Sequence, residues 1–116
     1  MKIALFQTKL AWENPEINRT FIEEYFLNED EPFDLFVLPE MFTSGFTMNP
    51  STVAETMEGE TMAWLKDLAK QKTCAITGSL VIKEDENFYN RMVFLFLFGE
   101  VRFYNKCHFF TFAGEA

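Results

Sequence analysis

The sequence predicts an α/β fold, in which strands and helices alternate before three consecutive strands end the chain. Three observations indicate this class. Two segments space their apolar residues like amphipathic helices, the segments around them are short and apolar or alternating like strands, and polar turns separate them. The expected order is β-α-β-α-β-β-β, with no repeat, low-complexity segment or interdomain linker. At 116 residues the chain is at most one domain.

The first strand and the first helix are expected near the start of the chain. Lys2 to Thr8 alternates and is rich in β-forming residues, as in a strand. Asn14 can cap a helix, and Pro15 suits the first helical position because its missing N–H costs nothing there. The helix is predicted over residues 15–27. Its expected buried stripe comprises Ile17, Phe21 and Tyr25.

The next strand is predicted over Asp34 to Leu38, a nearly all-apolar segment that suits a strand buried on both faces and ends at Pro39. From Glu40 to Glu58 the sequence shows no clear period and contains loop residues. A long loop at the carboxyl end of a central strand is more often functional than idle, because structureless loops of this length are uncommon. We therefore expect functional residues in this loop.

A second helix is predicted over Glu60 to Lys72, followed by three strands at residues 73–82, 88–98 and 101–105. Short turns join these strands. In the first of them, Gly78 permits another backbone segment to approach closely. The expected buried face of the helix comprises Met62, Leu65, Leu68 and Ala69.

Composition argues against several classes of partner. The net charge of −8, from 18 acidic and 10 basic residues, predicts no binding to nucleic acid or to anionic membranes. The longest apolar run, Met92 to Phe98, is far below the roughly 20 residues that span a bilayer, and the start of the chain lacks a secretion signal. The 2 cysteines fit a reducing cytoplasm, which is the expected location. The 15 phenylalanines suggest either a core that packs against something larger or a phenylalanine-rich genome.

Two ionisable residues follow apolar strand segments, Glu40 after the second predicted strand and Lys106 after the last one. Ligands of open α/β sheets bind outside the carboxyl ends of the strands, so this carboxylate and this ammonium can share one crevice. The residues alone leave three interpretations open. The two side chains can be ordinary surface charges, a structural ion pair, or groups that act together on a substrate.

The segments PEMFTSGF (39–46) and YNKCHF (104–109) resemble the nitrilase superfamily of carbon–nitrogen hydrolases, and most closely its omega-amidase (2-oxoglutaramate amidase) branch. The likeness runs along the whole chain and covers about the first half of such an enzyme. It implies that residues 1–116 form a partial carbon–nitrogen hydrolase domain, the N-terminal half of an α-β-β-α four-layer sandwich. It also implies a catalytic Glu, Lys and Cys, with the Cys expected beyond Ala116.

The resemblance implies that Glu40 and Lys106 are catalytic. Glu40 would take the thiol proton, pass it to the departing ammonia and activate water, and apolar neighbours are expected to raise its pKa. Lys106 would stabilise the oxyanion of the attacked amide. Phe42, which can equally pack against the second helix, is also a candidate for the substrate pocket. The full set of expected pocket residues comprises Phe42, Phe46, His108 and Glu115.

The two cysteines are expected to be structural. Cys74 begins a strand and suits a small buried side chain. Cys107 adjoins Lys106, but adjacent residues of an extended strand point to opposite faces, so Cys107 is expected to turn away from the site. Neither matches the nucleophile position of the family. No metal site is expected, because His108 has no further ligands at regular spacing, and the resemblance implies no cofactor.

The function that the resemblance implies for the complete protein is hydrolysis of a small ω-amide, such as 2-oxoglutaramate, to the acid and ammonia through a cysteine thioester. A small-molecule amide is therefore the expected partner, and the complete protein is expected to be a homo-oligomer. The chain of 116 residues alone is expected to be inactive. The alternatives are a nitrilase or N-carbamoyl hydrolase of the same superfamily, and an inactive fragment or interaction module in which Glu40 and Lys106 form a structural ion pair.

Overall fold

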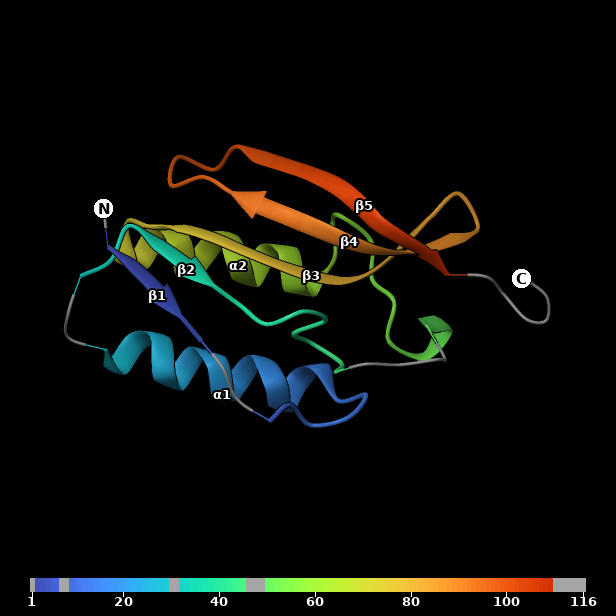
Figure 1. Ribbon diagram of the computed structural model, residues 1–116, viewed down its shortest axis with the longest axis horizontal. Helices are drawn as coiled ribbons and strands as arrows, with labels where there is room; N and C mark the ends of the chain where they lie inside the picture. Colours follow the sequence, from blue (N-terminus) through green and yellow to red (C-terminus); the bar gives the residue numbers. More distant parts are fainter. Residues whose placement is uncertain (1, 7–8, 30–31, 46–49, 110–116) are drawn as a thin grey trace.

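The computed structural model describes residues 2–6, 9–29, 32–45 and 50–109, with the backbone alone for 107–109 (Figure 1). Within these residues, five strands form one sheet and two α-helices accompany it, so the predicted α/β class and order of elements are confirmed. The elements are β1 (Ile3–Leu5), α1 (Pro15–Asn28), β2 (Leu35–Val37), the 3-10 helix η1 (Pro50–Thr52), α2 (Glu60–Lys72), β3 (Ala75–Glu84), β4 (Asn87–Leu95) and β5 (Val101–Phe109).

The strands lie in the order β1-β2-β3-β4-β5. The first three run parallel, and β4 and β5 are antiparallel to their neighbours, so β5 points in the same direction as β2. Asp85 and Glu86 join β3 to β4 with φ values of 52° and 69°, which is the two-residue turn that matches the twist of a hairpin. β5 continues to Phe109 and does not end at Asn105 as predicted.

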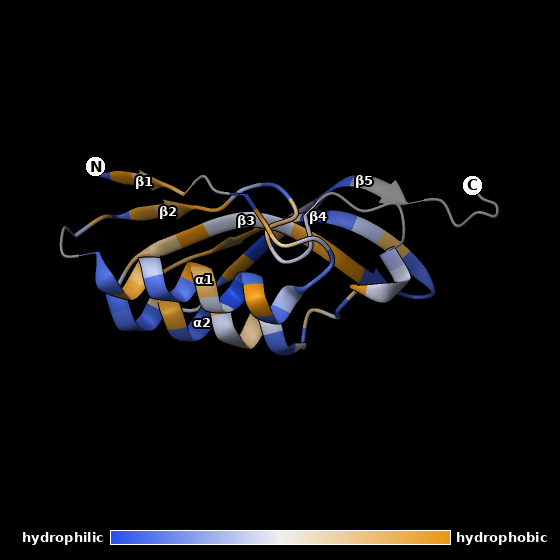
Figure 2. Ribbon diagram, turned by 90° about the horizontal axis from the view of Figure 1, so that it is seen from below, coloured by the Kyte–Doolittle hydropathy of each residue, from blue (hydrophilic) through white to orange (hydrophobic). Residues whose placement is uncertain are grey.

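Both helices lie on one side of the sheet, as Figure 2 shows. The main hydrophobic core fills the space between them and the strands, with Ile22 and Phe26 from α1, Leu65 from α2, and Phe36 and Ile76 from the sheet. Each of these side chains is almost completely buried. Burial of such a side chain contributes about 1.5–3 kcal/mol, so this layer holds the helices on the sheet.

The buried side of α1 differs from the prediction. Asn18, Ile22 and Phe26 are buried, one position further along than the expected stripe. Asn18 tolerates burial because its amide group accepts from the Ala11 N–H at 2.7 Å and donates to the carbonyl oxygens of Ala11 and Thr43 at 2.8 and 2.6 Å. The stripe predicted to be buried is half exposed: Ile17 (54%), Phe21 (51%) and Tyr25 (42%).

α2 has the predicted bounds and the predicted buried face. Its last residue is followed by Thr73, whose left-handed conformation (φ 52°) ends the helix and moves the start of β3 to Ala75. None of the described helices is long and apolar enough to cross a membrane. The predicted buried residues are at most 2% exposed: Met62, Leu65, Leu68 and Ala69.

No described helix covers the other face of the sheet (Figure 2), and several apolar side chains of the edge strands are exposed. Ile3 and Leu5 of β1 are 58% and 61% exposed, whereas Ala4 between them packs against the core. At the other edge, Tyr104 pairs with Met92 in the register and is 59% exposed. One helix layer and one sheet with an uncovered face are half of the predicted four-layer sandwich.

Candidate active site

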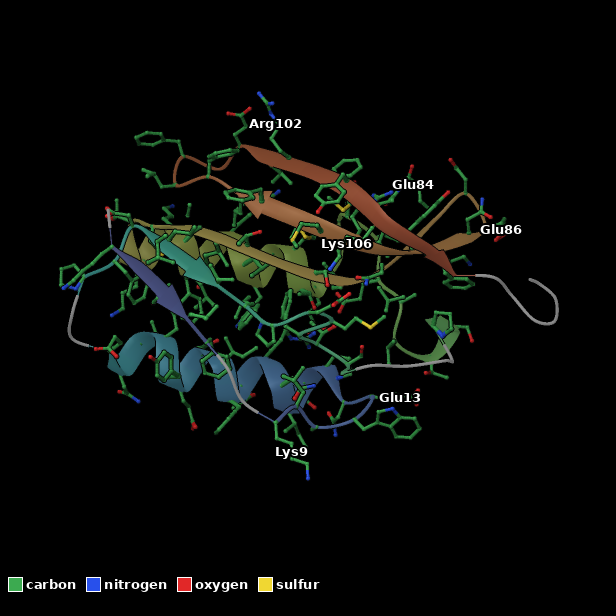
Figure 3. All side chains as sticks on the ribbon, viewed as in Figure 1. Lys9, Glu13, Glu84, Glu86, Arg102 and Lys106 are labelled. Atoms are coloured by element: carbon green, nitrogen blue, oxygen red, sulfur yellow. The ribbon has the colours of Figure 1, made fainter. Side chains whose placement is uncertain are left out.

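Glu40 and Lys106 meet directly, as the sequence predicts. Lys106 Nζ lies 3.1 Å from Glu40 Oε2, and the side chains are 31% and 58% exposed, respectively. Figure 3 labels Lys106 near the middle of the sheet. The amide of Asn90 donates to the same carboxylate oxygen at 2.8 Å. In the described part of the chain both polar contacts of Glu40 use the same carboxylate oxygen, Oε2.

The segment after β2 carries Glu40 along the edge of β3. Leu38 N–H donates to the Thr77 carbonyl oxygen at 2.8 Å, and Phe42 N–H donates to the Ser79 carbonyl oxygen at 3.0 Å. Between them Met41 adopts a left-handed conformation (φ 51°), and its N–H donates to Ser79 Oγ at 2.9 Å. Left-handed non-glycine residues are strained and persist only where their surroundings hold them. Ser79 therefore fixes the backbone directly after Glu40.

Gly78 provides the close approach that the sequence predicts. A Cβ at this position would lie 2.9 Å from Leu38 Cβ and 3.0 Å from the ring of Phe42. Any larger residue would therefore push the segment that carries Glu40 away from β3. The lack of a side chain at Gly78 is one reason why the carboxylate reaches the neighbouring strands.

Lys106 lies inside β5, not beyond its end. Arg91 pairs with Asn105 and Asn90 pairs with Cys107, so Lys106 is the extra residue of a β-bulge. Bulges bend a strand and re-aim a side chain, and they are frequent next to active sites. Because the bulge interrupts strict alternation, the argument that Cys107 must turn away from the site does not apply across it.

Asn90 is the contact residue that sequence reasoning missed. The signal that could have found it is an amide within the largely apolar segment FYNRMVF (88–94). The Asn90 side chain is 5% exposed, and its Oδ1 has no hydrogen-bond partner among the described residues. The opposite orientation of the amide would set two oxygens against each other at Glu40, so the donation through Nδ2 is the favourable arrangement.

The pKa of the Glu40 carboxyl is lowered, whereas the sequence predicts that it is raised. The hydrogen bond from Lys106 is the largest cause, followed by the hydrogen bond from Asn90, and both stabilise the charged form. Desolvation acts in the opposite direction and is the smaller effect, because more than half of the side chain is exposed. The apolar neighbours that suggested a raised pKa point into the core and leave the carboxylate in water.

The other predicted residues divide into three groups. Phe42 packs against the second helix, which was the stated alternative to a pocket position, because its side chain is completely buried and stacks on Trp64 of α2. Cys74 is buried as predicted, and burial raises the pKa of its thiol to about 11. The remaining positions lie outside the residues or side chains that the structure describes: Phe46, Cys107, His108 and Glu115.

Among the described residues, no group of three or more His, Cys, Asp or Glu side chains could hold a metal ion. The described side chains of the site supply a carboxylate, an ammonium and an amide. Such a set can accept a proton and stabilise a negative charge next to it.

A sequence model of the family described as Carbon-nitrogen hydrolase matches residues 2–116. Omega-amidase YafV of Escherichia coli (strain K12) is 32% identical over 115 residues, which are 99% of this chain and 44% of that protein. The 2-oxoglutaramate amidase of Bacillus subtilis (strain 168) is 28% identical over 116 residues, 97% of this chain and 45% of that protein. The chain thus spans less than half the length of these curated relatives.

Solved structures of carbon–nitrogen hydrolases are also similar to this chain. XC1258 from Xanthomonas campestris, a CN-hydrolase superfamily protein with an arsenic adduct in its active site, superposes with a TM-score of 0.87 at 34% identity over 99% of this chain and 43% of its own. An N-terminal amidase superposes with a TM-score of 0.77 over 91% of this chain and 28% of its own. At 16% identity this second likeness supports the fold alone.

Proposed function

Because the chain belongs to the carbon–nitrogen hydrolase family, we propose that the protein carrying it is an omega-amidase that hydrolyses a small ω-amide, such as 2-oxoglutaramate, to the acid and ammonia through a cysteine thioester. The single observation that carries this proposal is the contact of 3.1 Å between Glu40 and Lys106. The two residues come from the segments that resemble the family most closely, and their contact forms within these 116 residues.

Glu40 acts as the base in this proposal. A thioester forms when a thiol gives up its proton and its sulfur attacks the amide carbon, and the same proton then leaves with ammonia. Because Lys106 and Asn90 both bind Oε2, the other oxygen of the carboxylate can receive that proton. The lowered pKa makes Glu40 a weaker base than a desolvated carboxylate, so its role depends on its position and not on an unusual pKa.

Lys106 stabilises the oxyanion. The amide oxygen becomes negatively charged when the thiolate attacks, and a fixed ammonium stabilises this charge more than it stabilises the neutral amide. Glu40 Oε2 and Asn90 orient the ammonium and the carboxylate before substrate binds. A group that is already in place needs no reorganisation during the reaction.

We propose that the nucleophilic cysteine lies beyond Ala116 in the complete protein. Cys74 does not suit the role, because its thiol is buried in the core and its pKa is raised to about 11. The chain of 116 residues alone should then release no ammonia from 2-oxoglutaramate. If it does release ammonia, the Cys107→Ala variant decides: loss of turnover would make Cys107 the nucleophile, and retained turnover would indicate a different mechanism.

The test is ammonia release by the gene product that contains this sequence, with 2-oxoglutaramate, a nitrile and an N-carbamoyl amine as competing substrates. In the omega-amidase proposal, 2-oxoglutaramate gives the highest kcat/KM. Glu40→Gln should lower kcat by about 10²–10⁴-fold, and Lys106→Met by about 10²–10³-fold. Glu86→Gln, which removes the exposed partner of Lys83, is the matched control and should leave kcat unchanged. A preference for the nitrile or the carbamoyl compound would refute the choice of substrate.

The direct contact between the two charges also supports a second candidate, an inactive module with a structural ion pair. Exposed ion pairs contribute only about 0–1 kcal/mol to stability, so either candidate predicts a small coupling energy of unfolding, and turnover decides between them. Large losses in kcat in both Glu40→Gln and Lys106→Met support the enzyme. A protein with no turnover on any of the three substrates supports the module.

A further inference from the structure

Arg91 lies next to the site residue Asn90 in β4, but on the opposite face of the sheet. Asn90 contacts Glu40 on the uncovered face, whereas Arg91 is 1% exposed on the helix face. The guanidinium of Arg91 donates from Nε to Asn105 Oδ1 at 2.7 Å and from one terminal nitrogen to Glu84 Oε1 at 2.8 Å. Figure 3 labels Glu84 close to the β3–β4 turn. A buried cation thus binds the residue directly before Lys106.

Two aromatic rings fix the direction of this guanidinium. The ring centroids of Phe103 and Tyr89 lie 4.1 and 5.4 Å from the central carbon of Arg91. The planar group is held by these rings and by Glu84, so its Nε–H points in a fixed direction. Asn105 is exposed, and the bond to Arg91 holds its side chain against β4.

This bond distinguishes between two registers of β5. In the structure Arg91 pairs with Asn105, and Lys106 is the extra residue of the bulge. If Asn105 were the extra residue instead, Lys106 would stand opposite Arg91. Two cations would then face each other, and the ammonium would lie on the helix face, away from the carboxylate of the site. The pairing of Arg91 with Asn105 is incompatible with that alternative.

We propose that Arg91 and Asn105 form a register lock that makes Lys106 the extra residue of the bulge and thereby presents its ammonium to Glu40. Arg91 is thus a positioning residue for Lys106, although it lies on the other face of the sheet. The consequence for catalysis rests on the proposed function, but the geometry does not. The test therefore measures the Glu40–Lys106 contact directly and requires no turnover.

A zero-length carbodiimide cross-link is suited to this test, because it joins a carboxylate to an amine only where the two are in contact. In the chain of 116 residues, peptide mass spectrometry measures the yield of the Glu40–Lys106 amide. A mixture of ¹⁴N- and ¹⁵N-labelled chains separates links within one chain from links between chains, so self-association does not interfere. The Lys83–Glu86 pair, at 3.5 Å, provides an internal standard far from the bulge.

Three variants separate the register lock from a general stabilising role of Arg91. Asn105→Ala removes the acceptor and should lower the yield by about tenfold, because a hydrogen bond to a charged donor changes a population by at least that factor. Asn105→Asp keeps an acceptor for Arg91 Nε and should restore the yield. Glu84→Gln weakens the other contact of Arg91 and should leave the yield within about twofold of the unchanged chain, since its amide can still accept.

The outcomes are decisive in either direction. An unchanged yield in Asn105→Ala, an equal loss in Glu84→Gln, or no recovery in Asn105→Asp would each overturn the register lock. If circular dichroism shows that Asn105→Ala is unfolded, Asn105→Gln replaces it, because its amide is displaced by one methylene from the position that Arg91 Nε requires. A normal cross-link in that variant would also overturn the proposal.

Discussion

Replacement of Gly78 by alanine tests the link between strand packing and the site. The added Cβ would lie 2.9 Å from Leu38 Cβ and 3.0 and 3.2 Å from two ring atoms of Phe42. The ring can rotate away, but Leu38 Cβ moves only with its backbone. The segment after β2 must therefore shift away from β3, and Glu40, two residues beyond Leu38, shifts with it.

Two opposing terms determine the size of the effect. Overpacking of a well-packed core costs about 1–3 kcal/mol. Alanine in a strand is about 0.5–1 kcal/mol more favourable than glycine. The packing term is larger, so we expect Gly78→Ala to lower the free energy of unfolding by about 1–2 kcal/mol.

Urea unfolding monitored by circular dichroism measures this loss, at one fixed protein concentration because association changes apparent stability. Leu38→Ala provides the control. This substitution removes the outer side chain at a cost of about 2–5 kcal/mol but keeps Cβ, so the cost of Gly78→Ala should persist in the Leu38→Ala background. Two results would refute the claim that Leu38 Cβ limits how closely the segment after β2 can approach β3. One is a Gly78→Ala variant as stable as the unchanged chain, and the other is a loss of stability that vanishes in the Leu38→Ala background.

Three further predictions concern charge, thiol chemistry and association. Because the pKa of Glu40 is lowered from 4.5, its contribution to stability is present above that value and lost as the pH falls through the lowered pKa. The stability difference between the unchanged chain and Glu40→Gln should therefore shrink between about pH 7 and pH 3, and a difference that grows on acidification would contradict the assignment. Cys74 should resist alkylation at about pH 8 until the chain unfolds, because its thiol is buried; rapid labelling of the native chain would place it at the surface. The uncovered sheet face should bind a dye for apolar surface and cause self-association on size-exclusion chromatography, whereas a dye-negative monomer would show that Ile3, Leu5 and Tyr104 are covered in solution.

Sequence reasoning predicted the elements of the fold better than their contacts. α2 was predicted to the residue, because its apolar spacing is unambiguous. α1 has two stripes with the same spacing of four residues, and the buried one includes Asn18. The number of apolar residues favours the other stripe. Only tertiary contacts, such as the hydrogen bonds of Asn18 to Ala11 and Thr43, explain why an amide is buried.

The candidate site was predicted in part. The meeting of Glu40 and Lys106 was predicted, and the contact of 3.1 Å confirms it, although the premise that Lys106 follows the end of its strand was wrong. The bulge at Lys106 leaves no mark in the composition of β5, because it depends on pairing with a different strand. Asn90 was missed for the same reason. The direction of the pKa shift of Glu40 was wrong, because sequence neighbours do not reveal whether the carboxylate itself is desolvated.

The tight turn at Asp85 and Glu86 has a consequence for the order of folding. It joins β3 to β4, and residues 96–100 join β4 to β5, so the three strands form a meander of chain neighbours. Such local pairings form before distant ones. Asn90 and Lys106 both belong to this early unit. Glu40 belongs to the segment after β2, which pairs with β3 only by closing a much longer loop. The Glu40 carboxylate should therefore reach the Lys106 ammonium late in folding. A partly folded chain would then hold Lys106 in its strand while Glu40 is not yet in place.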